Sequence, residues 1–141
     1  WLEEPLDSRD YDGNAALKKV SKIKISGAEL NYGWDEIKIM FEKDCFHVYQ
    51  PDATFAGGIA QVKRVIDECH AKKREFSPHT WTNGIGFSIN WNMGQHAAAR
   101  ISARGAVVDT RVQGWHHRAD FTRQKRGAAS IQKTRSRIRN R

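Results

Sequence analysis

The stretch QPDATFAGGIAQVKRVIDECHAKKREFSPHTWTNGIG, residues 50–86, decides the fold that we predict for this chain. It reads as a strand that ends at Asp52, a helix that begins after Gly57-Gly58, and a second short strand that ends at His79. Parallel strands that are joined by right-handed crossovers have their carboxyl ends on the same side of a sheet. We therefore expect the side chains of Asp52 and His79 to meet.

The helix of this stretch has an amphipathic period. Charged residues such as Lys63 and Asp67 occupy one face. The predicted buried face consists of Ile59, Val62, Ile66 and Cys69. This pattern is typical of a βαβ unit in which the helix packs on a parallel sheet.

Two further strands are predicted upstream of this unit, and each has a glutamate at its end. The intervals from Glu3 to Glu29, from Glu29 to Asp52 and from Asp52 to His79 are 26, 23 and 27 residues. One β-loop-α-loop unit occupies about that length, so four polar residues recur once per unit. They fall at the carboxyl ends of consecutive strands, the edge where (β/α)8 barrels build their active sites.

We predict an α/β fold for residues 1–93, a partial (β/α)8 TIM barrel of about four consecutive βα units. The chain has 141 residues, whereas a closed barrel needs about 250. The sequence begins inside a predicted strand, so we interpret it as a fragment of a longer protein. Residues 80–93 should begin as a loop and continue as a helix, although Asn90, Trp91 and Asn92 weaken the helical pattern.

An ordered set of short motifs resembles the enolase superfamily, specifically its mandelate racemase/muconate lactonizing enzyme branch. The resemblance covers about residues 1–93, with the motifs in the order and spacing of the family. The motifs are Glu3-Glu4-Pro5, Gly27-Ala28-Glu29, Gln50-Pro51-Asp52 with Gly57-Gly58, and Pro78-His79-Thr80-Trp81. Ala28 is a departure, because a glycine is common there in the family.

Glu3 and Glu29 are the candidate metal ligands. Two carboxylates at adjacent strand ends repel each other unless a cation lies between them, and Mg²⁺ prefers oxygen ligands of this kind. The resemblance implies the same assignment, with a third Mg²⁺ ligand, an aspartate, on a strand upstream of this chain. The alternative is that both glutamates are solvated loop acids. Glu4 is expected on the other face of its strand, as a structural acid.

His79 and Asp52 are the candidate catalytic residues. A single histidine at a strand end is more often structural, but a neighbouring carboxylate fixes the imidazole tautomer and raises its proton affinity, as a general base requires. The resemblance implies that this pair removes the proton α to a substrate carboxylate, with Mg²⁺ stabilising the charge that develops.

The reaction that the resemblance implies for the intact parent is dehydration of an acid sugar, in which a β-hydroxyl leaves as water. The parent would then be a lyase, a hydro-lyase that takes a small sugar-acid carboxylate as substrate, and we expect it to be a homo-oligomer. Return of the proton to carbon would instead make it a racemase or epimerase. Without the upstream ligand, the amino-terminal capping domain and the closed barrel, this fragment is not expected to turn over substrate by itself.

The net charge of +8 is unevenly distributed. Residues 1–93 carry 12 basic and 14 acidic side chains, whereas residues 94–141 carry 12 basic and 2 acidic ones. We treat residues 94–141 as a separate, irregular basic tail, which is either disordered, translated from a shifted reading frame, or an arm that binds nucleic acid. A nucleic-acid-binding protein that acts through this tail is thus the alternative to the enzyme, and the less favoured one.

Cysteine content and hydropathy indicate a cytoplasmic protein. The sequence contains two cysteines, Cys45 and Cys69, and free buried thiols are typical of that compartment. No apolar run is long enough to span a membrane, so we expect no membrane partner.

Overall fold

The computed structural model describes residues 1–102, in which strands and helices alternate. Most of the predicted basic tail, residues 103–141, therefore lies outside the described residues. The elements are β1 (Leu2–Glu3), α1 (Tyr11–Val20), β2 (Ile25–Gly27), α2 (Gly33–Lys43), β3 (Val48–Tyr49), α3 (Ile59–Lys72), β4 (Glu75–Phe76) and α4 (Gly84–Ser102).

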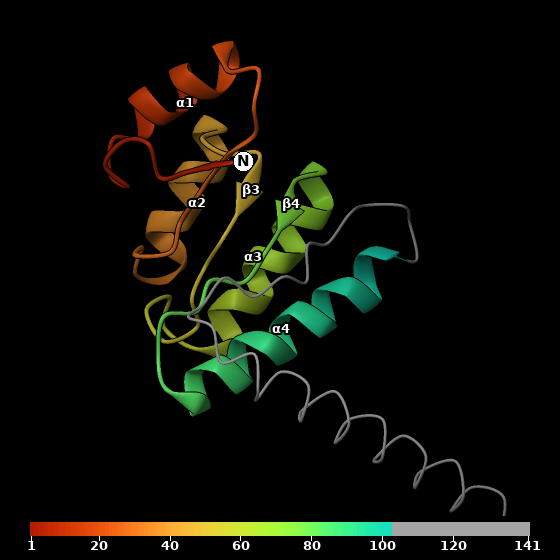
Figure 1. The fold of residues 1–141 in the computed structure, drawn as a ribbon. Helices are drawn as coiled ribbons and strands as arrows, with labels where there is room; N and C mark the ends of the chain where they lie inside the picture. The colour runs from red at the N-terminus through yellow and green to blue at the C-terminus, as the bar shows by residue number, and fades with distance from the viewer. Residues whose placement is uncertain (103–141) are drawn as a thin grey trace, which may run out of the picture.

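The four strands form one parallel sheet in the order β1-β2-β3-β4. Each strand is joined to the next by a helix, and neighbouring helices pack against each other from α1 to α4 (Figure 1). Sequential parallel pairing with a helix in every crossover is the repeating unit of a (β/α)8 barrel. The predicted fold class, a partial barrel of four βα units, is confirmed.

The strands are shorter than the sequence pattern indicates, and the candidate site residues Glu29, Asp52 and His79 lie in the loops that follow them. Ladder pairing in β2 covers Ile25–Gly27, and the backbone turns out of the sheet at Ala28, where φ is +87°. Glu4, just after β1, also has a positive φ of +38°. Early departure from the sheet leaves the polar residues at its carboxyl edge free to converge.

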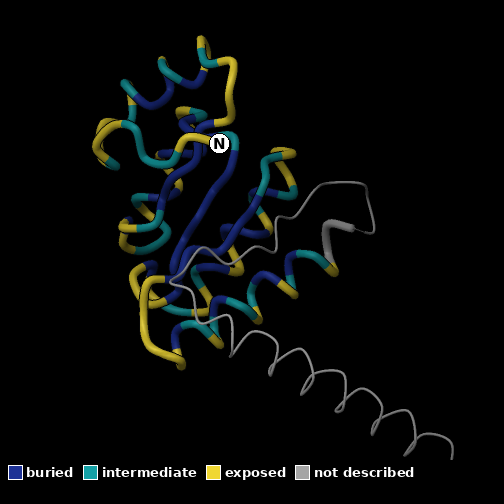
Figure 2. Tube along the Cα trace, in the orientation of Figure 1, coloured by how far each residue is buried: buried dark blue, intermediate teal, exposed yellow. Residues whose placement is uncertain are grey.

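Aromatic side chains fill the space between the sheet and its helices. Tyr49 of β3 stacks on Phe41 of α2 with ring centroids 3.8 Å apart, and the edge of Phe46 meets it at 5.8 Å. The buried Tyr49 hydroxyl donates a hydrogen bond to the Met40 carbonyl oxygen. Strands β2 and β3 are consequently buried along their whole length (Figure 2), which gives the loops at their carboxyl ends a rigid base.

Helix α3 follows the predicted amphipathic pattern with one correction. Its buried face consists of Val62, Val65, Ile66 and Cys69. Ile59, which we assigned to that face, is 47% exposed. It is the first residue of the helix, directly after Gly58, and no preceding helical turn covers its side chain. Cys45 and Cys69 are both free and buried, as predicted.

Helix α4 is longer than the pattern in residues 80–93 suggests, because it continues to Ser102. Asn83 caps its start, where the side-chain Oδ1 accepts hydrogen bonds from the backbone N–H groups of Ile85 (3.1 Å) and Gly86 (3.2 Å). Asn90, which weakened the helical pattern, is completely buried. Its side chain therefore points into the protein rather than into water.

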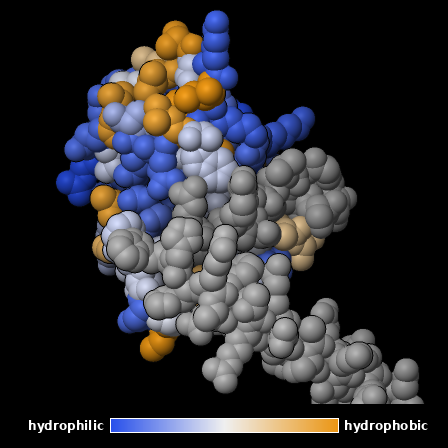
Figure 3. Space-filling view, in the orientation of Figure 1, coloured by the Kyte–Doolittle hydropathy of each residue, from blue (hydrophilic) through white to orange (hydrophobic). Residues whose placement is uncertain are grey.

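Some apolar side chains remain at the surface around α1 (Figure 3). Val20 is 78% exposed and Ile23 is 56% exposed, and Leu2 of the edge strand β1 is also exposed. Among residues 1–102 no helix combines the length and the apolar character needed to cross a membrane.

Replacing Ala28 by glycine tests the strain at its positive φ. A left-handed backbone costs an L-residue about 1–2 kcal/mol, which glycine avoids. The lost methyl burial costs about 0.8 kcal/mol and the glycine entropy about 0.5–1 kcal/mol, so Ala28→Gly should be near neutral in free energy of unfolding. Urea denaturation measures this difference.

Ala56 provides the matched control, since it is equally buried and does not have a positive φ. Ala56→Gly should lower the free energy of unfolding by about 1–2 kcal/mol, because no strain is relieved. An equal decrease in the free energy of unfolding for both variants would contradict the assignment of strain to Ala28.

Candidate active site and metal centre

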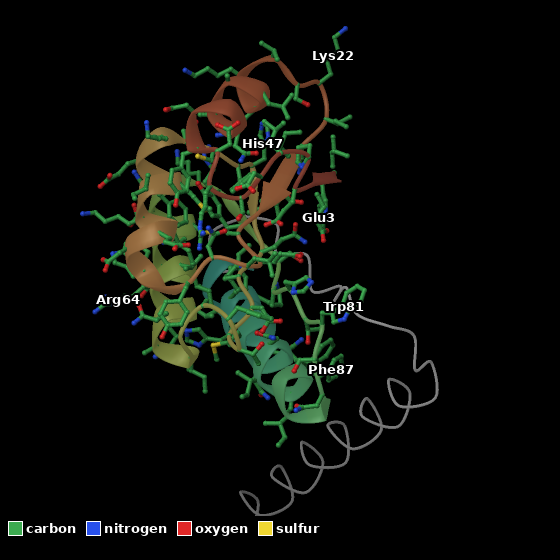
Figure 4. All side chains as sticks on the ribbon, turned by 90° about the vertical axis from the view of Figure 1, so that its left-hand side faces the viewer. Glu3, Lys22, His47, Arg64, Trp81 and Phe87 are labelled. Atoms are coloured by element: carbon green, nitrogen blue, oxygen red, sulfur yellow. The ribbon has the colours of Figure 1, made fainter. Side chains whose placement is uncertain are left out.

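The candidate residues meet at the carboxyl edge of the sheet, although they come from the ends of four different strands. Glu3, Glu29 and His79 each offer one ligand atom, and these atoms all lie within 4.8 Å of one another. Figure 4 shows Glu3 and Trp81 on one side of the molecule and Arg64 of α3, which is exposed, on the opposite side. The cluster therefore lies away from the helix layer formed by α1, α2 and α3.

His79 lies between two carboxylates. Its Nδ1 is 3.3 Å from Oδ2 of Asp52, and its Nε2 is 3.2 Å from Oε2 of Glu29. The imidazole is almost completely buried and Asp52 is completely buried. The structure thus brings Asp52 and His79 together as expected, and it adds a contact with Glu29 that the spacing of the residues did not indicate.

The second carboxylate oxygen of Asp52 is saturated with donors. Oδ1 accepts hydrogen bonds from the Thr54 backbone N–H (2.8 Å), from the Thr54 hydroxyl (2.7 Å) and from Nδ2 of Asn90 (2.8 Å). Sequence reasoning missed both Thr54 and Asn90. A polar residue on the buried face of an amphipathic helix is a signal that could have found Asn90, but we interpreted it only as a break in the pattern.

These contacts set the charge of the pair. Burial by itself would raise the pKa of Asp52, but the hydrogen bonds from His79, Asn90 and Thr54 outweigh it and hold that pKa well below its usual range. Burial would lower the pKa of His79, but the hydrogen bond to Asp52 and the charges of Glu29, Asp52 and Glu3 raise it. The result is a strongly anionic carboxylate beside an imidazole of increased basicity.

The glutamates crowd one another. Burial raises the pKa of Glu29, and the negative charges of Glu4 and Glu3 raise it further, whereas the charge of His79 opposes the shift. Glu4 is held apart from this cluster, because its Oε1 accepts hydrogen bonds from the backbone N–H groups of Ala28 (3.1 Å) and Glu29 (3.3 Å). Glu4 thus has the structural position that we expected, fixing the loop that carries Glu29.

Gln50, directly after β3, adds an amide to the cluster. Its Nε2 donates a hydrogen bond to Oε2 of Glu3 (3.1 Å), while its Oε1 has no hydrogen-bond partner among the described residues although Gln50 is completely buried. A buried acceptor without a donor is costly unless another group supplies one. Gln50 therefore leaves an open acceptor beside Glu3.

The donor set fits a divalent cation. A cation that lies between two neighbouring carboxylates reduces the repulsion between them. Mg²⁺ binds a few carboxylates together with water and substrate oxygens. Glu3 and Glu29, both only partly buried, offer such oxygens at the carboxyl edge of the sheet. The imidazole of His79 is left to accept a proton.

A family model described as "Enolase C-terminal domain-like" matches residues 1–130. The chain belongs to this family. The resemblance to the enolase superfamily, seen in the motifs around Glu3, Glu29, Asp52 and His79, is thereby confirmed.

Three similar proteins indicate which members of the family resemble this chain. L-talarate/galactarate dehydratase of Salmonella typhimurium is 30% identical over 79 residues, which are 56% of this chain and 20% of the relative. Its crystal structure with Mg and L-lyxarohydroxamate aligns with a TM-score of 0.57 and 25% identity, covering 66% of this chain and 23% of that chain. The structure of 3,6-anhydro-D-galactonate cycloisomerase from Zobellia galactanivorans aligns with a TM-score of 0.63 and 36% identity, covering 66% and 26%.

The chain spans about a fifth of the length of the curated relatives that it matches. By their names these relatives are a dehydratase and a cycloisomerase.

The charge state of His79 should appear in the pH dependence of stability. A histidine whose pKa is raised in the folded state adds stability below its ordinary pKa of about 6.5 and loses it as the pH rises through the folded value. The wild type should therefore exceed His79→Gln in free energy of unfolding by more at pH 6 than at pH 9. Urea denaturation at both pH values measures this difference.

Asn92→Ala, an exposed substitution on α4, is the control and should keep the pH dependence of the wild type. A difference between wild type and His79→Gln that stays constant from pH 6 to pH 9 would show that the ion pair with Asp52 and Glu29 does not form.

Proposed function

We propose that this chain is part of an Mg²⁺-dependent enzyme that removes the proton α to the carboxylate of a sugar acid and then eliminates the β-hydroxyl as water. The observation that carries the proposal is the contact of His79 with Asp52, beside the carboxylates of Glu3 and Glu29. A base and a pair of metal-binding carboxylates at the same edge are the two components that this reaction needs.

Glu3 and Glu29 are the residues that would hold Mg²⁺. When bound, the ion supplies positive charge that stabilises the negative charge developing on the substrate carboxylate. The Mg-containing structure of the similar dehydratase supports this choice of metal. Gln50 supports the site by orienting the carboxylate of Glu3 through its hydrogen bond.

His79 is the proposed base. Asp52 holds Nδ1 of the imidazole, which leaves Nε2, the nitrogen beside Glu29, as the atom that takes the proton from the α-carbon. The electron pair of the broken C–H bond moves toward the substrate carboxylate. The same Nε2–H then gives its proton to the β-hydroxyl. The electron pair returns from the carboxylate to form a Cα=Cβ double bond, and the C–O bond breaks with its electron pair on the departing water.

A cycloisomerase is the second candidate function. The similarity to 3,6-anhydro-D-galactonate cycloisomerase, at 36% identity, favours it, as does the similarity to the D-galactarolactone cycloisomerase of Agrobacterium fabrum, at 22% identity over 85 residues. Proton abstraction by His79 begins either reaction. It also begins the racemase or epimerase reaction, in which the proton returns to carbon. The reactions diverge at the step that follows.

Mg²⁺ binding provides the first test. Glu3→Gln and Glu29→Gln each remove a negative ligand, so each should weaken the binding of Mg²⁺ by at least about tenfold, or about 1.4 kcal/mol. Isothermal titration calorimetry measures the affinity. Glu42→Gln, an exposed residue of α2, is the matched control and should bind as the wild type does. Unchanged affinity in the double variant of Glu3 and Glu29 would exclude this metal site.

Exchange of the α-proton of galactarate with D₂O tests the role of His79. Exchange needs only the base and the charge of the metal, so we expect slow exchange with Mg²⁺ even where no dehydrated product accumulates. His79→Gln should lower the exchange rate by about 100-fold or more, because general base catalysis contributes that much. Proton NMR of galactarate follows the reaction. Exchange at an equal rate in His79→Gln, or without Mg²⁺, would contradict the proposal.

A further inference from the structure

Asn90 is the one fully buried residue of α4 whose side chain reaches the Asp52 loop, within the part of the chain that the structure describes. Its Nδ2 donates a hydrogen bond to Oδ1 of Asp52 at 2.8 Å. Its Oδ1 accepts a hydrogen bond from the backbone N–H of Ala53 at 2.9 Å. A single side chain therefore holds both the carboxylate of Asp52 and the backbone of the next residue.

The orientation of this amide follows from its partners. The backbone N–H of Ala53 can only donate, so it requires the oxygen of the Asn90 side chain. The ionised carboxylate of Asp52 can only accept, so it requires the NH₂ group. No other arrangement of the two amide atoms satisfies both partners, and aspartate or leucine at this position would satisfy at most one of them.

The remaining donors to Oδ1 of Asp52 do not anchor it to another element. Thr54 provides two hydrogen bonds to Oδ1, but it belongs to the same loop and moves with Asp52. Among the described residues, the partners of the Asp52 carboxylate from other parts of the chain are Asn90 and His79. Asn90 thus ties Oδ1 to α4, and this leaves Oδ2 directed at Nδ1 of His79.

We propose that Asn90 is a positioning residue for the pair of Asp52 and His79. By holding Oδ1 of Asp52, it directs Oδ2 at Nδ1 of the imidazole. This contact favours the neutral tautomer with the proton on Nδ1, against Glu29, which lies 3.2 Å from Nε2 and favours the proton there. The assignment of His79 as the base rests on the proposed function, whereas the effect on the tautomer does not. Helix α4 acts as the rigid support from which the pair is aligned.

The tautomer of His79 provides the test, since a residue that served only to stabilise the fold would not change it. Two-bond ¹H–¹⁵N spectra of the full chain at pH 10, without metal or substrate, distinguish the two neutral tautomers. The wild type should show a measurable share of the Nδ1–H form, although Glu29 lies beside Nε2. Asn90→Ala and Asn90→Asp should shift His79 toward the Nε2–H form, because Asp52 loses its anchor or meets a second carboxylate.

Asn92→Ala is the matched control, since Asn92 is exposed on the same helix and its Nδ2 donates a hydrogen bond to the Ser88 carbonyl oxygen, away from Asp52. It should leave the tautomer of His79 unchanged. A wild-type tautomer in both folded Asn90 variants would overturn the proposal.

A measurement on the wild type keeps the proposal testable if the Asn90 variants do not fold. The backbone amide of Ala53 and the side-chain NH₂ of Asn90 should exchange with D₂O as slowly as amides of the core strands, because both are buried and hydrogen-bonded. Fast exchange of the Asn90 side-chain amide would overturn the proposal.

The rate of α-proton exchange of galactarate distinguishes this proposal from the proposed function. Asn90→Ala should lower that rate by about 10–100-fold, because losing a residue that orients an active-site side chain commonly costs that much. The Mg²⁺ affinity should stay unchanged within about twofold. If no galactarate exchange occurs in any variant but the tautomer shifts, the proposed function fails and the positioning role stands. If exchange depends on His79 but neither exchange nor the tautomer depends on Asn90, the positioning role fails alone.

Discussion

The buried carboxylate of Asp52 is the constraint on which the arrangement of the site depends. An ionised group removed from water costs several kcal/mol unless hydrogen bonds and opposite charges replace its hydration. Thr54, Asn90 and His79 supply those partners, and they come from the loop after β3, from α4 and from the end of β4. Satisfying one carboxylate therefore fixes three segments relative to one another.

The rest of the site follows from this fixed point. Because Asp52 holds Nδ1, the opposite nitrogen of His79 faces Glu29, whose loop is in turn held by Glu4. Burial raises the pKa of Glu29, and the negative charges of Glu4 and Glu3 raise it further. A site with excess negative charge beside a basic imidazole is well suited to bind a cation and to accept a proton. The chain belongs to the enolase C-terminal domain-like family.

The fold supports this chemistry through rigidity at one side of the sheet. Tyr49, Phe41 and Phe46 pack β3 against the helix layer, so the strand ends that carry the site have little freedom to move. The backbone departs from the sheet with a positive φ at Glu4 and Ala28. In a buried alanine this conformation stores strain, and such strain commonly persists where the surrounding structure holds a loop in a functional position.

The sequence by itself determined the order of strands and helices, the edge of the sheet at which Glu3, Glu29, Asp52 and His79 converge, and the pairing of Asp52 with His79. Regular spacing is sufficient for these conclusions, because parallel βα units repeat with one handedness and place every strand end at one edge. Only the tertiary structure decided the hydrogen bonds of Asn90, the contact of His79 with Glu29 and the exposure of Ile59. Such details depend on how each helix is rotated and where each loop leaves the sheet, which the periodicity of a single element does not record.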